Sequence, residues 1–479
     1  MLSAQKQPRV LSVFVLAMLN LSIMLSLRTL PVLAQLGLSS IFFFLTVGLF
    51  FLLPCALVSA ELATGWPKSG GIYIWVREAL GDRLGFFSIW MQWVHNVAWY
   101  PVILSFVAAI LAHITYPSLT ENKFYILAVI LTCFWGMTLF NYFGIKLSSK
   151  ASSIGVIIGT ILPGLFIIGL GAFWIFSDRP QAISFDTQTL LPDLSSMSNL
   201  VFLAGLFLAF SGLEVSASLA GEVKNPQKTY PRAISLAAFI TFFILILGAL
   251  AISYILPPEE ISLVAGLMEA LERFLPSFGL SSLQPVLGGL LILGALAEVN
   301  SWLIAPIKGL HTTSLHGNLP PFFQKLNPHG TPTHLLFFQA LIVSFTSLVF
   351  LFMPNISSGF WILTILSAQS YLIMYILMFI AAIRLRYTKP HVHRIYKIPF
   401  PHKGIWVVSL MGIIASVFAI IIGFVPPTHL DVGSPVFYKA FLGSGLFIMC
   451  IIPLIIYQFK KPSWSLSLTR AQEEKEHSL

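Results

Sequence analysis

Two short polar stretches interrupt long apolar segments of this chain: Asn20-Leu21-Ser22-Ile23-Met24-Leu25-Ser26 and Phe210-Ser211-Gly212-Leu213-Glu214-Val215-Ser216. Each stretch lies near the middle of an apolar run that is long enough to cross a bilayer as a helix. Polar atoms and helix-breaking residues are costly at that depth, because no water is present to satisfy the backbone. We therefore expect two interrupted membrane helices.

The composition is that of a membrane protein. The chain has 479 residues, of which 57% are hydrophobic and only 9% are charged, whereas a soluble protein carries about a quarter charged residues. Apolar runs of roughly 20 residues occur twelve times, at approximately 11–35, 40–63, 84–112, 124–142, 151–177, 197–221, 232–256, 284–314, 335–353, 358–386, 404–424 and 437–459. Membrane barrels use much shorter, alternating strands. The sequence predicts an all-α, polytopic protein with twelve transmembrane helices.

The net charge of +9 has an uneven distribution along the chain. Of the 27 Lys and Arg residues, 22 fall in the N-terminus, the C-terminus and the loops that follow even-numbered spans. This bias predicts that both termini are cytoplasmic, in a cell membrane or, in a Gram-negative bacterium, the inner membrane. The partner is then the lipid bilayer, and no nucleic acid is expected. Residues 29–34 could pass for a signal-peptide cleavage region, but we interpret the long run as a retained first helix.

Enzyme motifs are missing from the sequence. It has no GxSxG elbow, HExxH pair, Walker loop or intramembrane Asp pair, so we expect no catalytic residue, no cofactor and no enzymatic activity. Cys55, Cys133 and Cys450 are odd in number and far apart, which predicts neither a disulfide nor a zinc site. His391 and His393 could bind a metal, but their basic neighbours favour a cytoplasmic loop without one.

The interrupted spans are the first and the sixth, five spans apart. That spacing is typical of an inverted repeat of two five-helix units, of the LeuT-like kind, with a substrate site between the breaks. The predicted organisation is a cytoplasmic N-terminus (1–10), two repeats (11–177 and 197–386), two further helices (404–459) and a short cytoplasmic tail (460–479). Half-helix N-termini can bind a carboxylate and freed carbonyls an ammonium, so such a site suits an amino acid.

A simpler interpretation of the polar residues stays open. Ser and Gly are common where membrane helices pack closely, so Ser22, Ser26, Ser211 and Gly212, taken singly, are more often packing residues than ligands. Their paired placement in two spans favours the site.

Further stretches give the chain a family resemblance. Ala60-Glu61-Leu62-Ala63-Thr64, Pro67, Gly70-Gly71-Ile72-Tyr73-Ile74-Trp75 and Leu80-Gly81 resemble the second-helix signature of the amino acid-polyamine-organocation superfamily. Gly212-Leu213-Glu214 and Gly221-Glu222-Val223-Lys224-Asn225-Pro226 resemble its sixth helix and the following loop. Gly294-Ala295-Leu296-Ala297-Glu298-Val299-Asn300-Ser301-Trp302, with Pro306 and Asn318-Leu319-Pro320, is similar to the eighth helix of bacterial glutamate/GABA antiporters.

The resemblance implies which residues line the substrate site. The unwound first helix would take the substrate carboxylate at Ser22, Ile23, Met24, Leu25 and Ser26. The other implied positions are Asn96, Leu208, Ser211, Gly212, Trp302 and the tenth-helix tyrosines Tyr371 and Tyr375. Leu208 stands where arginine/agmatine antiporters have a gating Trp, which argues against a guanidinium substrate. His95 is expected to pack or to face another helix.

The function that the resemblance implies is exchange of glutamate or glutamine for GABA, by alternating access and in a monomer or a homodimer. Decarboxylation of the imported amino acid consumes a proton, so the exchange would help a cell resist acid. A longer tail plugs the cytoplasmic mouth in some relatives, and the short tail here argues against that device. Two alternatives stay open: a proton-coupled transporter of polyamines or cationic amino acids, and a nontransporting nutrient sensor.

Charged residues inside the spans are the last candidates. Glu214 is predicted to respond to protons, because burial disfavours its charged form; alternatively, it accepts hydrogen bonds from nearby hydroxyls and stays charged. Arg28 could contact an acidic substrate side chain or extend to the interface. Glu61, Glu222 and Glu298 are expected to pair with loop cations such as Lys68 or Lys224.

Overall fold

A computed structural model describes residues 12–67, 70–177, 179–183, 190–192, 197–216, 223–400, 402–428 and 430–466. All regular elements within these ranges are helical. In the described part of the chain, eleven helices are long and apolar enough to cross a membrane: Val13–Ala34, Ser39–Gly65, Asp82–Thr115, Lys123–Tyr142, Lys150–Phe176, Lys228–Ser253, Ser281–Leu315, Thr333–Phe352, Ile356–Thr388, Lys403–Ile422 and Pro435–Gln458. These spans confirm an all-α, polytopic fold. Each begins and ends within a few residues of a predicted span.

The sixth predicted span, 197–221, is not a continuous helix. The described helix in this span is α10 (Met197–Ala209), which is 13 residues long. The helix stops at Phe210, and Gly212 has a φ of 111°, a conformation that side chains with a Cβ rarely adopt. Glu222 and the other residues of 217–222 lie outside the described residues.

The first span is interrupted as well. Helix α1 (Val13–Met24) ends at Leu25, and both Leu25 and Ser26 have extended backbones. A 3₁₀ turn (Leu27–Thr29) and a short helix α2 (Leu30–Ala34) complete the span. Both interruptions that the sequence predicts are therefore present. The cause is local: polar residues compete for the backbone, and Gly212 permits the sharp turn.

The other helices follow the predicted order. Their bounds are α3 (Ser39–Val47), α4 (Leu53–Gly65), α5 (Ile72–Leu80), α6 (Asp82–Thr115), α7 (Lys123–Tyr142), α8 (Ile145–Val156), α9 (Leu162–Phe176), α11 (Pro226–Ser253), α12 (Gly266–Ser277), α13 (Gln284–Leu315), α14 (Thr333–Ser347), α15 (Val349–Phe352), α16 (Ile356–Thr388), α17 (Lys403–Ile422) and α18 (Pro435–Gln458). Single π-helical turns join α3 to α4 (Gly48–Leu52) and α8 to α9 (Ile157–Ile161).

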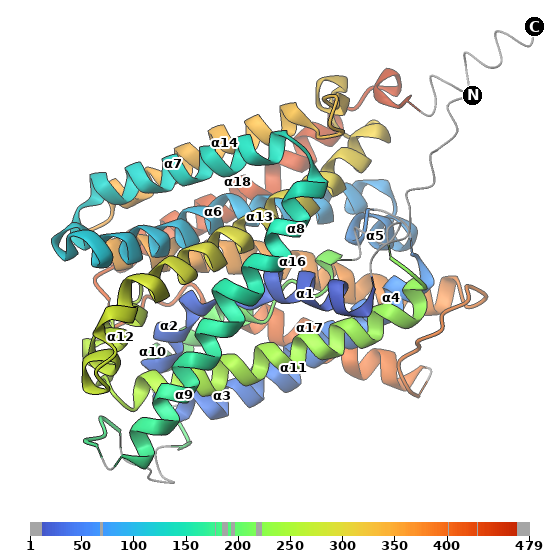
Figure 1. The fold of residues 1–479 in the computed structure, drawn as a ribbon. Coiled ribbons are helices and arrows are strands. Elements are labelled where there is room, and N and C mark those ends of the chain that lie inside the picture. The colour runs from blue at the N-terminus through green and yellow to red at the C-terminus, as the bar shows by residue number, and fades with distance from the viewer. Residues whose placement is uncertain are drawn as a thin grey trace, which may run out of the picture.

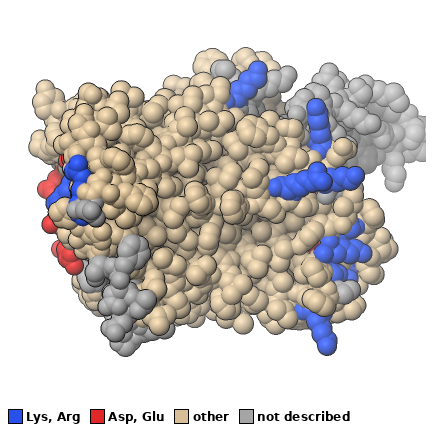
Figure 2. Space-filling view, turned by 60° about the horizontal axis from the view of Figure 1, so that its bottom comes forward, with Lys and Arg blue, Asp and Glu red and all other residues tan. Residues whose placement is uncertain are grey.

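The long helices run side by side, with α6, α13 and α16 through the middle (Figure 1). Most residues of α6 and α16 are buried, whereas α17 and α18 expose many large apolar side chains. The short helices α5 and α12 lie at opposite ends. Most Lys and Arg side chains in view gather at the α5 end, and a broad uncharged band separates them from the α12 end (Figure 2). We call the α5 end the basic end.

Candidate functional site

Glu214 lies directly after the break that ends α10 and is only 1% exposed. Its Oε1 accepts hydrogen bonds from the Tyr371 hydroxyl and from Gln92 Nε2, the latter at 3.0 Å. Its Oε2 accepts a hydrogen bond from the Tyr375 hydroxyl. Since Tyr371 and Tyr375 are four residues apart on α16, they lie on the same helix face, and both hydroxyls donate to the Glu214 carboxylate. Glu214 therefore accepts hydrogen bonds from hydroxyls, which is what one of the two predictions for this residue stated.

The same group of residues stabilises the break in α10. The backbone N–H of Gly212 has lost its helical partner and donates to the Tyr375 hydroxyl at 2.7 Å. A Cβ on Gly212 would lie 2.7 Å from Cγ2 of Ile23 and 3.2 Å from the Trp302 ring. The break in α10 therefore touches the break in α1, and only glycine fits between them.

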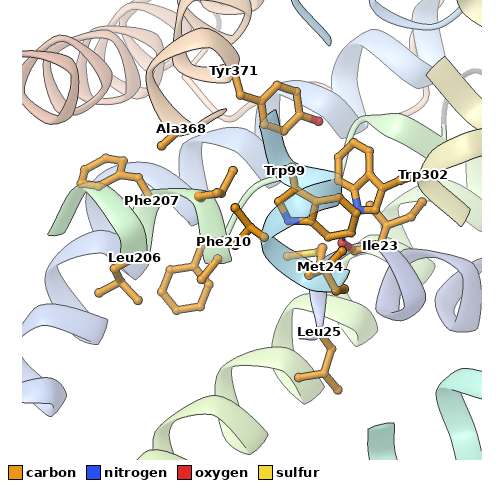
Figure 3. Close-up of a cluster of buried hydrophobic side chains, with 14 of the residues drawn as sticks. Ile23, Met24, Leu25, Trp99, Leu206, Phe207, Phe210, Trp302, Ala368 and Tyr371 are labelled. Atoms are coloured by element: carbon orange, nitrogen blue, oxygen red, sulfur yellow. Dashed lines mark hydrogen bonds between the residues drawn. The ribbon is translucent and has the colours of Figure 1, made fainter. Parts of the chain in front are cut away.

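Trp302 of α13 contacts both helix breaks. Its Nε1 donates to the Ile23 carbonyl at 3.0 Å, next to the point where α1 ends. One residue earlier, the Ser301 hydroxyl lies 2.8 Å from that of Ser22. Ile23, Met24, Trp99 and Trp302 gather around the first break, with Tyr371 approaching from α16 (Figure 3). The structure thus brings predicted residues from α1, α10, α13 and α16 together.

The third-helix contribution differs from the expectation. Asn96 donates from Nδ2 to the Gln92 carbonyl of its own helix at 3.1 Å, and its buried Oδ1 has no partner among the described residues. His95 instead stacks on Tyr371, with ring centroids 3.9 Å apart, and meets Trp302 edge-on at 5.0 Å. His95 therefore faces other helices, as expected, but it does so within the candidate site. Gln92, His95 and Trp99 share one face of α6 at helical spacing, a signal that the sequence interpretation did not use.

Arg28, in the turn after the first break, is 3% exposed and does not extend to an interface. Its guanidinium lies over the rings of Trp99 (5.6 Å) and Phe360 (5.8 Å), while its buried Nε has no partner in the described part of the chain. Cation–π contacts of this kind stabilise a desolvated cation in part. A cavity of about 10 Å³ beside Arg28 is lined also by Leu208 and Thr364.

Glu298 occupies a different environment from the expected one. The prediction that it pairs with a loop cation is wrong, because it lies within α13, is 5% exposed and interacts electrostatically with Arg28 and with the Ser26 hydroxyl. A helix places Glu298 four residues before Trp302 and therefore on the same face. Ser211 lies at the break after α10, and its hydroxyl donates to the Phe207 carbonyl of its own helix at 2.8 Å.

Glu61 forms a separate ion-pair network at the basic end. Its carboxylate binds Arg386 of α16 through two hydrogen bonds, accepts the backbone N–H of Ile398 at 2.9 Å and lies 3.7 Å from Arg394. Glu61 therefore pairs with cations, as expected, but these are Arg386 at the end of α16 and Arg394 in the following loop; Lys68 lies outside the described residues. The network joins α4 to α16, away from the two breaks.

Comparison with known proteins agrees with this architecture. The family model described as amino acid permease matches residues 10–449. A protein of Legionella pneumophila named an uncharacterized transporter is 45% identical over 93% of this chain and 96% of its own length. A glutamate/gamma-aminobutyrate antiporter of Lactococcus lactis is 30% identical over 94% of this chain and 90% of its own. A probable agmatine/putrescine antiporter of the same species is 25% identical over 76% of this chain and 77% of its own.

Eleven apolar spans and a buried polar cluster between two broken helices define a multi-pass membrane protein of the transporter class. The chain belongs to the amino acid permease family, within the amino acid-polyamine-organocation superfamily. The resemblance found in the sequence is thereby confirmed. Proteins of this family transport small molecules, so the substrates are small molecules and the environment is a bilayer.

Proposed function

We propose that the protein is an amino acid antiporter of the cytoplasmic membrane that exchanges glutamate or glutamine for GABA or a similar amino acid. The observation that carries the proposal is the contact of two helix breaks at Ile23, Gly212 and Trp302, directly beside the buried Glu214. The antiporters of Lactococcus lactis support the choice of substrates. In a Gram-negative cell the membrane would be the inner one, with both termini cytoplasmic.

The first ten spans would form the two five-helix repeats, 11–177 and 197–386, and the substrate would bind between them. Its carboxylate would meet the unwound stretch Ser22–Ser26, and Asn96, Leu208, Ser211 and Gly212 would complete the wall with Trp302. Transport then needs only alternating access, in which the substrate shifts the population of two conformations by its different affinity for each.

Tyr371 and Tyr375 would link proton binding by Glu214 to the structure of the substrate site. Their hydroxyls hold Glu214, so a change in its protonation would rearrange both hydrogen bonds and the Gly212 N–H that depends on Tyr375. Coupling of this kind makes exchange depend on pH. Import of glutamate and export of its decarboxylated product would consume intracellular protons and support acid resistance.

One observation favours a second candidate, a transporter of polyamines or cationic amino acids. Glu298 is a second buried carboxyl near the first break, and two carboxyls suit a cationic substrate better than one. Arg28 opposes this candidate, because it places a cation in the same region. We therefore prefer the neutral or acidic amino acids.

The test is counterflow in liposomes that hold the purified protein. Vesicles are preloaded with one unlabelled compound, and uptake of labelled glutamate, glutamine, GABA, arginine and putrescine is followed at pH 5.5. We expect uptake of glutamate or glutamine into GABA-loaded vesicles and none into empty ones. Uptake of only arginine or putrescine would move the function to the cationic candidate, and absence of all uptake would contradict both.

A further inference from the structure

A groove of about 330 Å³ lies between α4 and α11 and does not include the residues of the candidate site. Its walls are α4, through Leu53, Ala56 and Ala60, and α11, through Ser235, Ala238 and Phe242. Small side chains at Ala56, Ala60, Ser235 and Ala238 leave the space between the walls unfilled, and the π-helical turn Gly48–Leu52 forms part of one wall. π-Helical turns are rare in proteins as a whole, but those that occur often lie at functional sites.

The groove is apolar along most of its length and polar at one end. Among its lining residues, the Tyr396 side chain lies in the loop at the basic end, and Pro231 lies in the first turns of α11. At the other end the wall is formed by Gly48 and Phe242. A ligand that fits a groove of this kind has a long apolar part and a polar head.

Two exposed cations continue the groove toward the basic end. Lys228 and Arg232 lie on α11, seven and three residues before Ser235 respectively, so they share the helix face that lines the groove. Lys397 follows Tyr396 directly and is exposed as well. Cations at the membrane interface attract anionic headgroups.

We propose that this groove binds an anionic phospholipid of the leaflet at the basic end, with an acyl chain between α4 and α11 and the phosphate at Lys228 and Arg232. The distribution of charge also argues against a second copy of the chain as the occupant of the groove. Copies in one membrane share one orientation, so the cations of one copy would face the basic end of the other (Figure 2). The lipid site is distinct from the substrate site and does not depend on the substrate chosen above.

The direct test is photolabelling in nanodiscs made of phosphatidylcholine. The probe is phosphatidylglycerol with a diazirine on its acyl chain, and labelled peptides are identified by mass spectrometry. We expect labels on residues 48–60 and 231–242. Unlabelled phosphatidylglycerol should compete better than phosphatidylcholine by about 25-fold, since each of the two cations near the surface contributes about fivefold.

Two variants test the two parts of the ligand. Ala56→Trp fills the groove at a half-buried position and should abolish the labels. The double variant Lys228→Gln/Arg232→Gln changes only surface residues, so it should fold normally and lose the preference for phosphatidylglycerol.

Matched controls accompany them. Arg384→Gln/Lys403→Gln removes two exposed cations from α16 and α17, and Ile414→Trp adds a ring to the exposed face of α17; both should leave labelling unchanged. Labels spread evenly over all exposed helices, a preference that survives Lys228→Gln/Arg232→Gln, or crosslinks between two copies at the groove would each overturn the proposal.

Discussion

Gly212 carries the contact between the two breaks, because its φ of 111° and its distance from Ile23 both exclude a side chain. We predict that Gly212→Ala reduces exchange by at least about tenfold, since the breaks must separate to admit a Cβ that would lie 2.7 Å from Ile23. The measurement is initial exchange rate per folded protein in liposomes. Gly136→Ala is the control, because a Cβ there meets nothing within 4 Å. Equal rates for both variants would contradict this prediction.

Tyr375 has two roles, since its hydroxyl donates to Glu214 and accepts from the Gly212 N–H. Tyr375→Phe leaves that buried N–H without an acceptor, at a cost of about 1–3 kcal/mol, or about 5- to 150-fold in the population of the ordered break. We expect a comparable loss of exchange. Tyr438→Phe also removes a buried hydroxyl bond, to the Gly423 carbonyl, but lies away from the site and should retain exchange. A fully active Tyr375→Phe would show that the bond to Gly212 is dispensable.

Residue identity alone predicted part of the site. Glu214 and Gly212 stood out because polar and helix-breaking residues inside a membrane are costly, whereas the tyrosines of α16 were implied only by the family resemblance. The role of His95 and the environment of Glu298 were missed, because both depend on which helix lies opposite. Helical spacing gives the shared face of Glu298 and Trp302, but not that Arg28 packs near that face.

At the scale of elements, the buried network around Glu61 connects α4 to the end of α16. Glu61→Gln leaves Arg386 and Arg394 buried with less compensation, so we predict a loss of about 3–5 kcal/mol in unfolding free energy. The readout is thermal unfolding in detergent. For comparison, Glu260→Gln removes a pair with Arg273 in which both side chains are 52% exposed, and should change stability by less than about 1 kcal/mol. Similar shifts for the two variants would refute the structural role of Glu61.

The helical elements were predictable because a bilayer fixes their length and composition. Both interruptions were predictable too, since Asn and Ser lie in the middle of the first span, and Ser, Gly and Glu in the middle of the sixth. The extent of the sixth helix was not. Hydropathy continues through 197–221, whereas the helix ends at Ala209, because Gly212 and the bond from its N–H to Tyr375 favour a turn.

For the whole molecule, the uneven distribution of cations predicts the orientation in the membrane. A variant without its three native cysteines would carry one new cysteine, as Lys403→Cys at the basic end or Glu259→Cys beyond the end of α11; both positions are exposed. We expect a membrane-impermeant maleimide to label Glu259→Cys in intact cells, and Lys403→Cys only after lysis. The reverse pattern would invert the topology.

The central claim is that Glu214, held at the junction of two broken helices, couples exchange to protons. The most direct measurement compares glutamate exchange by the native protein and Glu214→Gln in liposomes at pH 5.5 and 7.5, with the exposed Glu272→Gln as control. We expect exchange by the native protein and by the control to change between these pH values, whereas Glu214→Gln exchanges at one rate at both. A Glu214→Gln protein with the native pH dependence would contradict it.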